Sequence, residues 1–216
     1  MRVVAIDGPA GAGKSTIARA LARRLEVPYL DTGAMYRAVT HAALRDGVEP
    51  NDADAMTRLA TTSRIDVSDE LVTVDGIDVT REIRSDRINK AVSHVAAISG
   101  VRTVLREQQR AWVAKHGGGV VEGRDIGTVV FPYATLKVFL TASPEVRARR
   151  RVAESGGDVE TIARSIAERD RLDSSRVDSP LMTADGSITV DTSDLSIDQV
   201  VARLHELVLE RETTRG

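Results

Sequence analysis

The sequence lacks cysteine altogether and is poor in aromatic residues. Without cysteine, neither a disulfide framework nor a thiolate metal site can form, and an intracellular setting is the simpler expectation. Aromatic residues make up 3% of the chain, which leaves few stacking platforms for single-stranded nucleic acid. No run approaches about 18 uninterrupted apolar residues, and no charged leader precedes the first apolar run. We therefore expect a cytoplasmic protein that neither spans a membrane nor binds a nucleic-acid polymer.

The chain also lacks an excess of charge of either sign. Thirty basic residues stand against 32 acidic ones, so the formal charge is -2 and no net positive field attracts polyanions. Any phosphate binding must then depend on local groups. With 216 residues and 42% hydrophobic content, the chain can bury the core of one domain carrying inserts. The even charge and the lack of an obvious apolar stripe favour a monomer.

The most informative motif is Gly-Pro-Ala-Gly-Ala-Gly-Lys-Ser at residues 8–15. It completes the pattern G-x-x-x-x-G-K-[ST], follows an apolar run at 3–6 and precedes a helical pattern at 14–25. The glycines let backbone N–H groups turn toward phosphates, Lys14 places a charge near the β and γ oxygens, and Ser15 can ligate Mg2+. A Gly-rich surface turn is the weaker interpretation, because strand, loop and helix occur in the required order. We predict that a nucleoside triphosphate binds the residues of this segment, which are Gly8, Pro9, Ala10, Gly11, Ala12, Gly13, Lys14, Ser15 and Thr16.

Short apolar runs alternate with longer helical patterns, which is typical of an α/β sheet with helices on both faces. We expect core strands near 2–7, 28–31, 119–123, 136–141 and 187–191. Helical periodicity predicts helices at 14–25, 34–46, 52–62, 92–115, 144–154, 158–171 and 196–211. The predicted core is therefore a five-stranded parallel sheet flanked by helices.

One segment interrupts this alternation with three short pieces of period-2 pattern, at 64–67, 71–74 and 77–79. Asp75 and Gly76 separate the last two pieces and are a strong signal for a two-residue hairpin. We interpret 64–80 as a small antiparallel insert outside the parallel sheet, placed to contact a second ligand. A hairpin without a functional role is the alternative.

Arginines follow the ends of two predicted core strands. Arg37 comes soon after the strand at 28–31, and Arg124 follows the strand at 119–123. The carboxyl ends of parallel strands meet at one edge of the sheet, where α/β proteins bind their ligands. Guanidinium groups hold a phosphate dianion in a bidentate manner, so these two arginines are candidates for an acceptor-phosphate clamp. Either one alone would more often be a solvated surface charge.

A third basic cluster lies in the helix predicted at 144–154. It contains Arg147, Arg149, Arg150 and Arg151, and a glycine pair follows at 156–157. A basic helix hinged by two glycines can close over phosphates as a lid that excludes water and neutralises charge. A solvated basic face is an equally good interpretation, since four arginines cannot all reach one ligand. For the mixed-charge run at 169–176, the pattern alone favours an ion-paired helix end.

Four segments of this sequence resemble the bacterial cytidylate kinases. They are the loop at 8–15, Leu-Asp-Thr-Gly-Ala-Met-Tyr-Arg at 30–37, Glu-Gly-Arg-Asp-Ile-Gly-Thr-Val-Val-Phe-Pro at 122–132, and Glu-Arg-Asp at 168–170. The resemblance runs nearly end to end. It implies an α/β P-loop kinase fold with an enlarged monophosphate-binding insert and a helical lid. It also implies transfer of the γ-phosphoryl group of ATP, as Mg-ATP, to CMP or dCMP in pyrimidine nucleotide metabolism.

The resemblance implies where the phosphate and the base of CMP bind. The phosphate is expected at Arg37 and Arg124, and the cytosine at Ser93, Arg102 and Asp125. Cytosine offers an amino donor beside two acceptors, so Asp125 should face the amino group and Arg102 or Ser93 the acceptors. Uracil would leave the Asp125 carboxylate without a donor, at a cost of about 1 to 3 kcal/mol. We therefore expect discrimination against UMP.

The resemblance implies further CMP contacts and a division of the chain. Thr32 and Tyr36 would line the same pocket, while the ribose and the neighbouring phosphate would bind Arg169, Asp173 and Arg176. This replaces the ion-pair interpretation of the last three residues. The chain would be a single P-loop kinase domain, with a core at about 1–60, 92–146 and 185–216, an insert at about 61–91 and a lid at about 147–172.

The predicted mechanism is direct in-line transfer without a covalent enzyme intermediate. Lys14 and the lid arginines, with Arg149 and Arg150 as the named candidates, offset charge on the transferred group. Arg124 aligns the acceptor, and Ser15 is the expected protein ligand of Mg2+. No general base is required, because the acceptor phosphate has a second pKa of about 6 and is largely dianionic near pH 7.

Two positions depart from the pattern of some relatives, which carry Ser in place of Ala10 and Asp in place of Glu122. The longer Glu122 side chain weakens its assignment as a group that orients Mg2+ through water. Other functions remain as alternatives with less support. A GTPase would carry N-K-x-D, and the nearest match, at 89–92, lacks the Asp. A kinase for another small acceptor would not need the hairpin insert, and a non-catalytic nucleotide-binding protein would not need arginines at an acceptor site.

Overall fold

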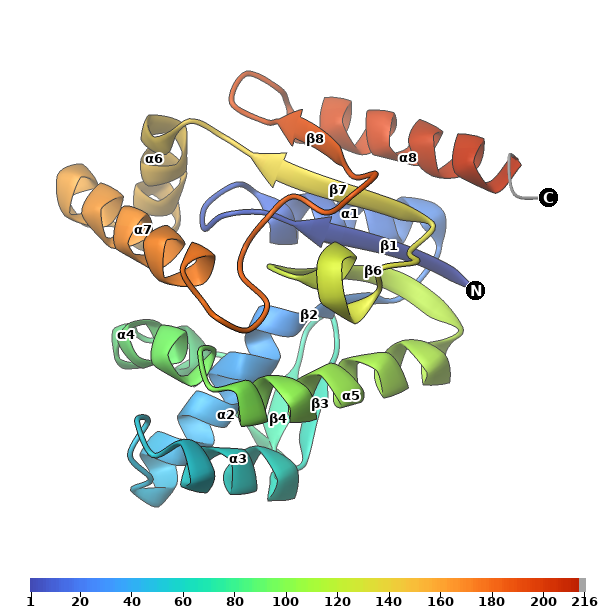
Figure 1. The fold of residues 1–216 in the computed structure, drawn as a ribbon. Coiled ribbons are helices and arrows are strands. Elements are labelled where there is room, and N and C mark those ends of the chain that lie inside the picture. Colours follow the sequence, from blue (N-terminus) through green and yellow to red (C-terminus); the bar gives the residue numbers. More distant parts are fainter. Residues whose placement is uncertain (214–216) are drawn as a thin grey trace. The chain divides into compact units, whose positions relative to one another are not determined.

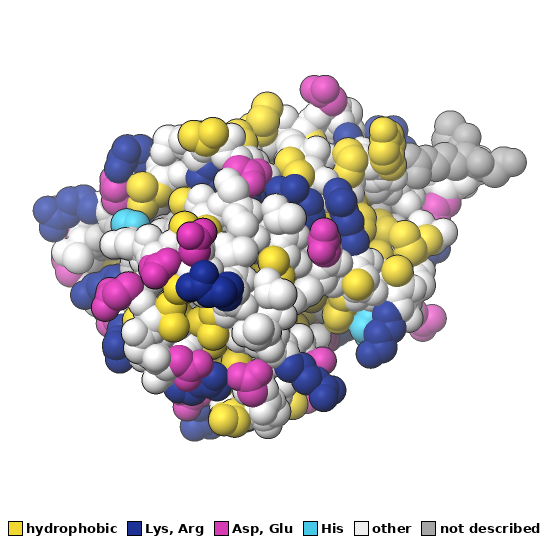
Figure 2. Space-filling model, turned by 60° about the horizontal axis from the view of Figure 1, so that its bottom comes forward, with side chains coloured by type: hydrophobic (Ala, Val, Ile, Leu, Met, Phe, Trp, Pro, Cys, Tyr) yellow, Lys and Arg dark blue, Asp and Glu magenta, His cyan; other side chains and the backbone are white. Residues whose placement is uncertain are grey.

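The computed structural model describes residues 1–213. The described chain divides into two compact units, one formed by residues 1–29 with 116–213 and the other by residues 30–115 (Figure 1). Acidic and basic side chains are interspersed over the face seen in Figure 2, as the near balance of charge leads one to expect. Within residues 1–213, every helix is too short or too polar to cross a bilayer.

A five-stranded parallel sheet has the strand order β2-β6-β1-β7-β8 (Figure 1). Its strands are β1 (Arg2–Asp7), β2 (Tyr29–Asp31), β6 (Gly118–Gly123), β7 (Leu136–Thr141) and β8 (Ile188–Asp191). The apolar run 3–6 in β1 is buried throughout, as a parallel strand covered on both faces requires. The structure confirms the predicted sheet, and each strand begins and ends within one residue of its expected bounds.

Two helices of the first unit share one hydrophobic core with this sheet. They are α1 (Lys14–Leu25) and α8 (Ile197–Thr213). Apolar residues three to four apart bury one side of each helix, for example Ile17 and Leu21 in α1 and Val201 and Leu204 in α8. Because α1 follows β1 directly, this packing fixes the loop between them at the carboxyl end of the sheet.

A pair of helices, α6 (Pro144–Ser155) and α7 (Val159–Ser174), follows β7 (Figure 1). Ser143 caps α6 and Asp158 caps α7, each side chain accepting a backbone N–H three residues later. Gly156 and Gly157 connect the helices with φ angles of 71° and 101°, which favour glycine. The two predicted helices are confirmed, while their action as a lid stays a prediction.

The second unit contains the predicted antiparallel insert. Its strands β3 (Ile65–Val67), β4 (Val72–Val74) and β5 (Ile77–Asp78) form a separate sheet in this order. Asp75 and Gly76 have φ angles of 55° and 82°, as a two-residue turn with both central residues left-handed requires. Val72 and Val74 pack against alanines of α2 (Thr32–Asp46), so the insert has a core of its own.

The remaining helices of this unit correct one prediction. The helix expected at 92–115 is two helices, α4 (Asp86–Val95) and α5 (Ser99–His116), with a break at 96–98; α3 (Ala53–Thr62) and a short 3-10 turn, η1 (Glu82–Arg84), complete the unit. The sequence Ala-Ala-Ile at the break carries no helix breaker. A local side-chain bond and a tertiary contact flank the break. The Ala96 carbonyl accepts from the Arg102 side chain, and a Cβ on Gly100 would lie 2.2 Å from Oγ1 of Thr57 in α3.

Candidate functional site

The loop between β1 and α1 has the backbone form of a phosphate-binding nest. Gly13 precedes α1 with a left-handed φ of 82°. A Cβ on Gly8, whose φ is 149°, would lie 2.0 Å from the carbonyl oxygen of Leu140 in β7, so only glycine fits there. Within the described chain no side chain caps the N-terminus of α1 and its first turn holds no acidic residue. An anion can therefore bind these N–H groups and the positive end of the helix.

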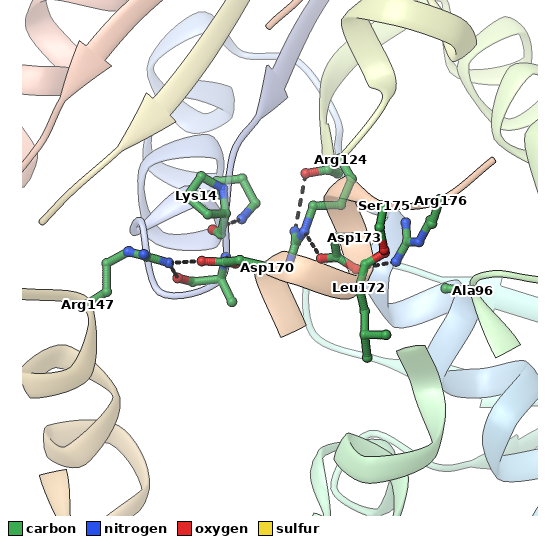
Figure 3. Close-up of polar contacts among 12 residues, drawn as sticks. Lys14, Ala96, Arg124, Arg147, Asp170, Leu172, Asp173, Ser175 and Arg176 are labelled. Carbon is green, nitrogen blue, oxygen red and sulfur yellow. Dashed lines mark hydrogen bonds and ion pairs between the residues drawn. The ribbon is translucent and has the colours of Figure 1, made fainter. Parts of the chain in front are cut away.

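Lys14 is buried at this loop, and its Nζ donates to the carbonyl oxygen of Pro9 at 2.7 Å (Figure 3). Burial, and after it the neighbouring charges of Arg124 and Arg169, lower the pKa of Lys14 to about 7, although Glu122 and Asp173 act in the opposite direction. The site thus concentrates positive groups around a buried amine. A polyanion bound here would relieve their mutual repulsion.

Arg124 and Asp173 form a buried ion pair between the end of β6 and the end of α7. Arg124 Nε donates to Asp173 Oδ2 at 2.8 Å, and Arg176 donates to the other carboxylate oxygen (Figure 3). Burial alone would raise the pKa of Asp173, but the charges of Arg124, Arg176 and Arg169 lower it below its usual value. One carboxylate therefore orients two of the arginines expected to bind CMP.

Arg147 and Asp170 attach the α6–α7 pair to the loop at 8–15. Asp170 Oδ1 accepts the backbone N–H of Ala10 at 3.1 Å, and Arg147 donates to the Ala10 carbonyl oxygen at 3.1 Å (Figure 3). Arg147 also donates to the second oxygen of Asp170, which closes the arrangement. The backbone N–H and the carbonyl oxygen of one loop residue, Ala10, are thus both held by side chains of the predicted lid.

The other arginines of α6 have different surroundings. Arg150 donates to the hydroxyl and to the carbonyl oxygen of Thr192, at 2.9 and 2.6 Å. Its Nη1 would lie 3.6 Å from a Cβ on Gly13, so it borders the loop. Arg149 is exposed, and Arg151 pairs with Glu154 at 3.2 Å. Counting residues could not distinguish these side chains, whereas the structure identifies Arg147 and Arg150 as those beside the loop.

Five of the predicted CMP residues lie in the second unit, on α2, α4 and α5. Arg37 donates to Asn89 Oδ1 at 2.6 Å and to the carbonyl oxygen of Ile83 at 3.1 Å, so α4 and η1 orient it. Arg102 is buried with its guanidinium 5.5 Å from the ring centre of Tyr36, a cation–π arrangement. The two remaining residues are both buried, namely Thr32 and Ser93.

Glu122 is buried near the end of β6 and accepts a hydrogen bond from the hydroxyl of Tyr29. The guanidinium of Arg19, on α1, lies 5.2 Å from the centre of the Tyr29 ring. The sequence pattern drew attention to Glu122 as a possible group around Mg2+, but it gave no sign of the tyrosine. Tyr29 fixes the position of the Glu122 carboxylate.

Asp7 is a residue of the site that sequence reasoning missed. It is buried at the end of β1 and accepts the backbone N–H groups of Ile126 and Gly127, at 2.8 and 2.7 Å. These residues begin a short π-helical turn, η2 (Ile126–Val130), directly after Arg124 and the buried Asp125. The available signal was an acidic residue ending an otherwise apolar strand.

Metal binding would depend on the nucleotide as much as on the protein. Within residues 1–213, no group of three or more His, Asp or Glu side chains is placed to hold a metal ion. Mg2+ commonly takes its ligands from phosphates, water and one or two protein oxygens. Ser15 is an exposed residue at the start of α1, and its hydroxyl fits that donor set.

The family model described as cytidylate kinase matches residues 4–210. This chain belongs to the cytidylate kinase family. It is 50% identical to a cytidylate kinase of Rhodococcus opacus (strain B4), covering 97% of this chain and 95% of that protein. It is 48% identical to a cytidylate kinase of Geobacillus sp. (strain WCH70), covering 96% of each. The chain is therefore an ATP-dependent kinase, a transferase, as the resemblance predicted.

Solved structures support the fold. A shikimate kinase from Bacteroides thetaiotaomicron has a TM-score of 0.50 at 16% identity, covering 96% of this chain and 98% of that one. An uncharacterized protein from Eubacterium ventriosum has a TM-score of 0.56 at 12% identity, covering 97% and 98% of the two chains. The P-loop kinase fold of this cytidylate kinase family member is thus confirmed.

Proposed function

We propose that this chain transfers the γ-phosphoryl group of ATP to CMP or dCMP, giving CDP or dCDP and ADP, in pyrimidine nucleotide metabolism. The observation that carries this function is the match to the cytidylate kinase family along residues 4–210, with relatives about 50% identical over nearly the whole chain. The phosphate-binding loop and Arg124, at the end of β6, lie within that match.

ATP binds through the loop residues 8–16. The glycine backbone cradles the phosphates, and the Lys14 charge lies against the β and γ oxygens. When bound, Mg2+ neutralises charge on those oxygens, and Ser15 would be its protein ligand. The buried position of Lys14 among other cations supports this assignment, because the amine gains most from an anionic ligand.

The acceptor phosphate binds Arg37 and Arg124. Asp173 holds Arg124 by its Nε, so the guanidinium is oriented before the substrate arrives and loses little further freedom. Arg169 and Arg176 bind the ribose or the neighbouring phosphate together with Asp173. In-line transfer to a phosphate dianion then needs alignment and charge neutralisation but no general base.

The cytosine binds Ser93, Arg102 and Asp125, with Thr32 and Tyr36 lining the pocket. The Asp125 carboxylate accepts from the amino group, which uracil lacks. Arg149 and Arg150 stabilise the transferred group as the lid arginines. The position of Arg150 beside Gly13 of the loop supports this role for Arg150, whereas the exposed position of Arg149 gives Arg149 less support.

The test measures ADP formation from Mg-ATP with CMP, dCMP, UMP and AMP supplied separately, and identifies the products by chromatography. We expect CMP and dCMP to be phosphorylated well above UMP and AMP. ATP binding without turnover of any acceptor would refute the proposed function. We also propose a cytoplasmic monomer, and a sedimentation mass of twice the chain would refute the monomer.

A further inference from the structure

Asp7 is a buried acidic group that the proposed mechanism does not use. It follows the four buried apolar residues at 3–6, and its own exposed fraction is 4%. Burial, together with the nearby charge of Asp125, raises its pKa to about 6, although its two backbone donors and Lys14 act in the opposite direction. The side chain therefore remains largely ionised at neutral pH. A buried carboxylate is costly, so its partners indicate what it does.

Those partners are two consecutive backbone N–H groups of another segment. Oδ1 accepts from Ile126 at 2.8 Å, and Oδ2 accepts from Gly127 at 2.7 Å. The hydrogen bonds of the π-helical turn η2 begin at the carbonyl oxygen of Asp125, which accepts the N–H groups of Val129 and Val130. The N–H groups of residues 126 and 127 come before the first of these donors in the chain. Asp7, at the end of β1, supplies their acceptors. An acidic residue from a different strand thus caps the turn.

Asp7 also lies beside the end of β6 in the sheet, so it attaches this part of the chain at a second point. β1 and β6 lie side by side, and the register pairs Asp7 with Gly123 (Figure 1). Asp7 therefore holds the chain at Gly123 through the strand pairing and at residues 126–127 through its side chain. Arg124 and Asp125 are the two residues between these attachments.

We propose that Asp7 is a positioning residue for the acceptor, which fixes the short segment carrying Arg124 and Asp125. This inference rests on the proposed function, in which Arg124 binds the phosphate of CMP and Asp125 its base. In this proposal Asp7 acts through the backbone of residues 126 and 127, which engages both of its oxygens, and not by binding the substrate.

The chemistry of the contact requires a carboxylate of this length. Asparagine would present one acceptor and one N–H donor to two N–H donors, so one bond would be lost and replaced by a repulsive contact. Space is also limited: a Cβ on Gly127 would lie 3.3 Å from Asp7 Oδ2 and 3.2 Å from Cδ of Lys137. A longer acidic side chain at position 7 would push the turn away.

The first test compares Asp7→Asn with Asp191→Asn. Asp191 also ends a strand of the sheet and accepts a backbone N–H, that of Ser193, but it is exposed. Initial rates are measured with CMP varied at saturating Mg-ATP, and then with Mg-ATP varied at saturating CMP. We expect Asp7→Asn to raise KM for CMP on the order of tenfold and to leave KM for Mg-ATP within about twofold, with no change in Asp191→Asn. An unchanged KM for CMP, or equal rises in both constants, would overturn the proposal.

The second test needs no substrate, and so separates this proposal from the proposed function. Amide hydrogen exchange is measured by mass spectrometry on peptides covering 124–131 and 8–16. In Asp7→Asn we expect faster exchange in the first peptide and unchanged exchange in the second. Unchanged exchange in both peptides would show that Asp7 does not fix the turn at residues 126–127, and would refute the proposal even if the wild type phosphorylates CMP. Failure of the wild type to use CMP would instead refute the proposed function.

If Asp7→Asn does not fold, Gly127→Ala gives the same comparison from the other side of the contact. Its added methyl group presses on Asp7 and Lys137 while the carboxylate stays in place. We expect a smaller rise in KM for CMP and faster exchange in 124–131. Wild-type values for both would contradict the proposal.

Discussion

The first unit contains two regions suited to binding phosphate, and they use different chemical groups to do so. The loop at 8–15 uses backbone N–H groups, with glycines at positions such as Gly8 and Gly13 where a side chain would clash or strain. The cluster around Asp173 uses side chains instead, because one carboxylate orients Arg124 and Arg176. A backbone site depends on local geometry, whereas a side-chain site depends on charges that must compensate one another when buried. Substitutions should therefore affect the two regions in different ways.

The largest effect should come from the single charge in the backbone site. Lys14→Met removes the amine that lies against the β and γ oxygens and leaves the glycine loop intact. We expect kcat to fall about 10²- to 10³-fold, since loss of one group that stabilises transition-state charge typically costs this much. The measurement is the steady-state rate of CDP formation.

Lys115→Met is the matched control, because Lys115 is exposed on α5. It should keep the wild-type rate. If Lys14→Met also keeps the wild-type rate, Lys14 has no part in transfer.

The side-chain site should show its largest effect in stability. Asp173→Asn leaves Arg124 and Arg176 without their shared counter-charge in a buried position. We expect the free energy of unfolding to fall by about 3 kcal/mol, the typical cost of removing one partner of a buried ion pair. Urea denaturation followed by circular dichroism measures this.

Glu168→Gln provides the comparison for Asp173→Asn. Glu168 pairs with Arg171 three residues later, as Asp173 does with Arg176, but both side chains of this pair are exposed. We expect no measurable change in the free energy of unfolding, because water screens exposed pairs. Equal losses in the two variants would show that burial does not distinguish these ion pairs.

A smaller effect should appear in the choice of base. Asp125→Asn can both donate and accept, so it should tolerate the O4 of uracil. We expect the ratio of kcat/KM for CMP to that for UMP to fall about tenfold. Asp185→Asn, at an exposed loop position, should leave the ratio unchanged. A wild-type ratio in Asp125→Asn would remove Asp125 from base recognition.

The smallest effect is a proton taken up by Lys14 when the nucleotide binds. With its pKa lowered from 10.5 to about 7, Lys14 is mostly neutral in the free protein at pH 8. The triphosphate favours the charged form and raises that pKa, so binding takes up a proton and weakens as the pH rises above 7. Calorimetry at pH 8 in buffers of different ionisation enthalpy should detect an uptake approaching one proton.

Lys14→Arg serves as the control for proton uptake, because a guanidinium stays charged at pH 8. Binding to this variant should take up no proton through position 14. The same uptake in Lys14→Arg as in the wild type would assign the proton to another group.

Much of the fold could be predicted from the sequence, since the signals are local. The parallel strands were visible as apolar runs, and the insert as period-2 pattern around Asp75 and Gly76. The single helix expected at 92–115 was wrong. Its break is flanked by the bond from Arg102 to the Ala96 carbonyl and by the close approach of Gly100 to Thr57. Contacts of this kind leave no periodic trace in the chain.

By itself, the sequence determined the phosphate-binding loop, the succession of most strands and helices along the chain and, through resemblance, the family. The loop, the strands and the helices could be predicted because each forms from residues that are neighbours along the chain. Only the tertiary structure decided that Asp173 joins Arg124 to Arg176, that Arg147 and Asp170 hold Ala10, and that Asp7 caps a turn at residue 126. A buried charge needs a partner, and packing supplies that partner from residues that lie far away in the sequence. The sequence alone therefore does not show which residues pair.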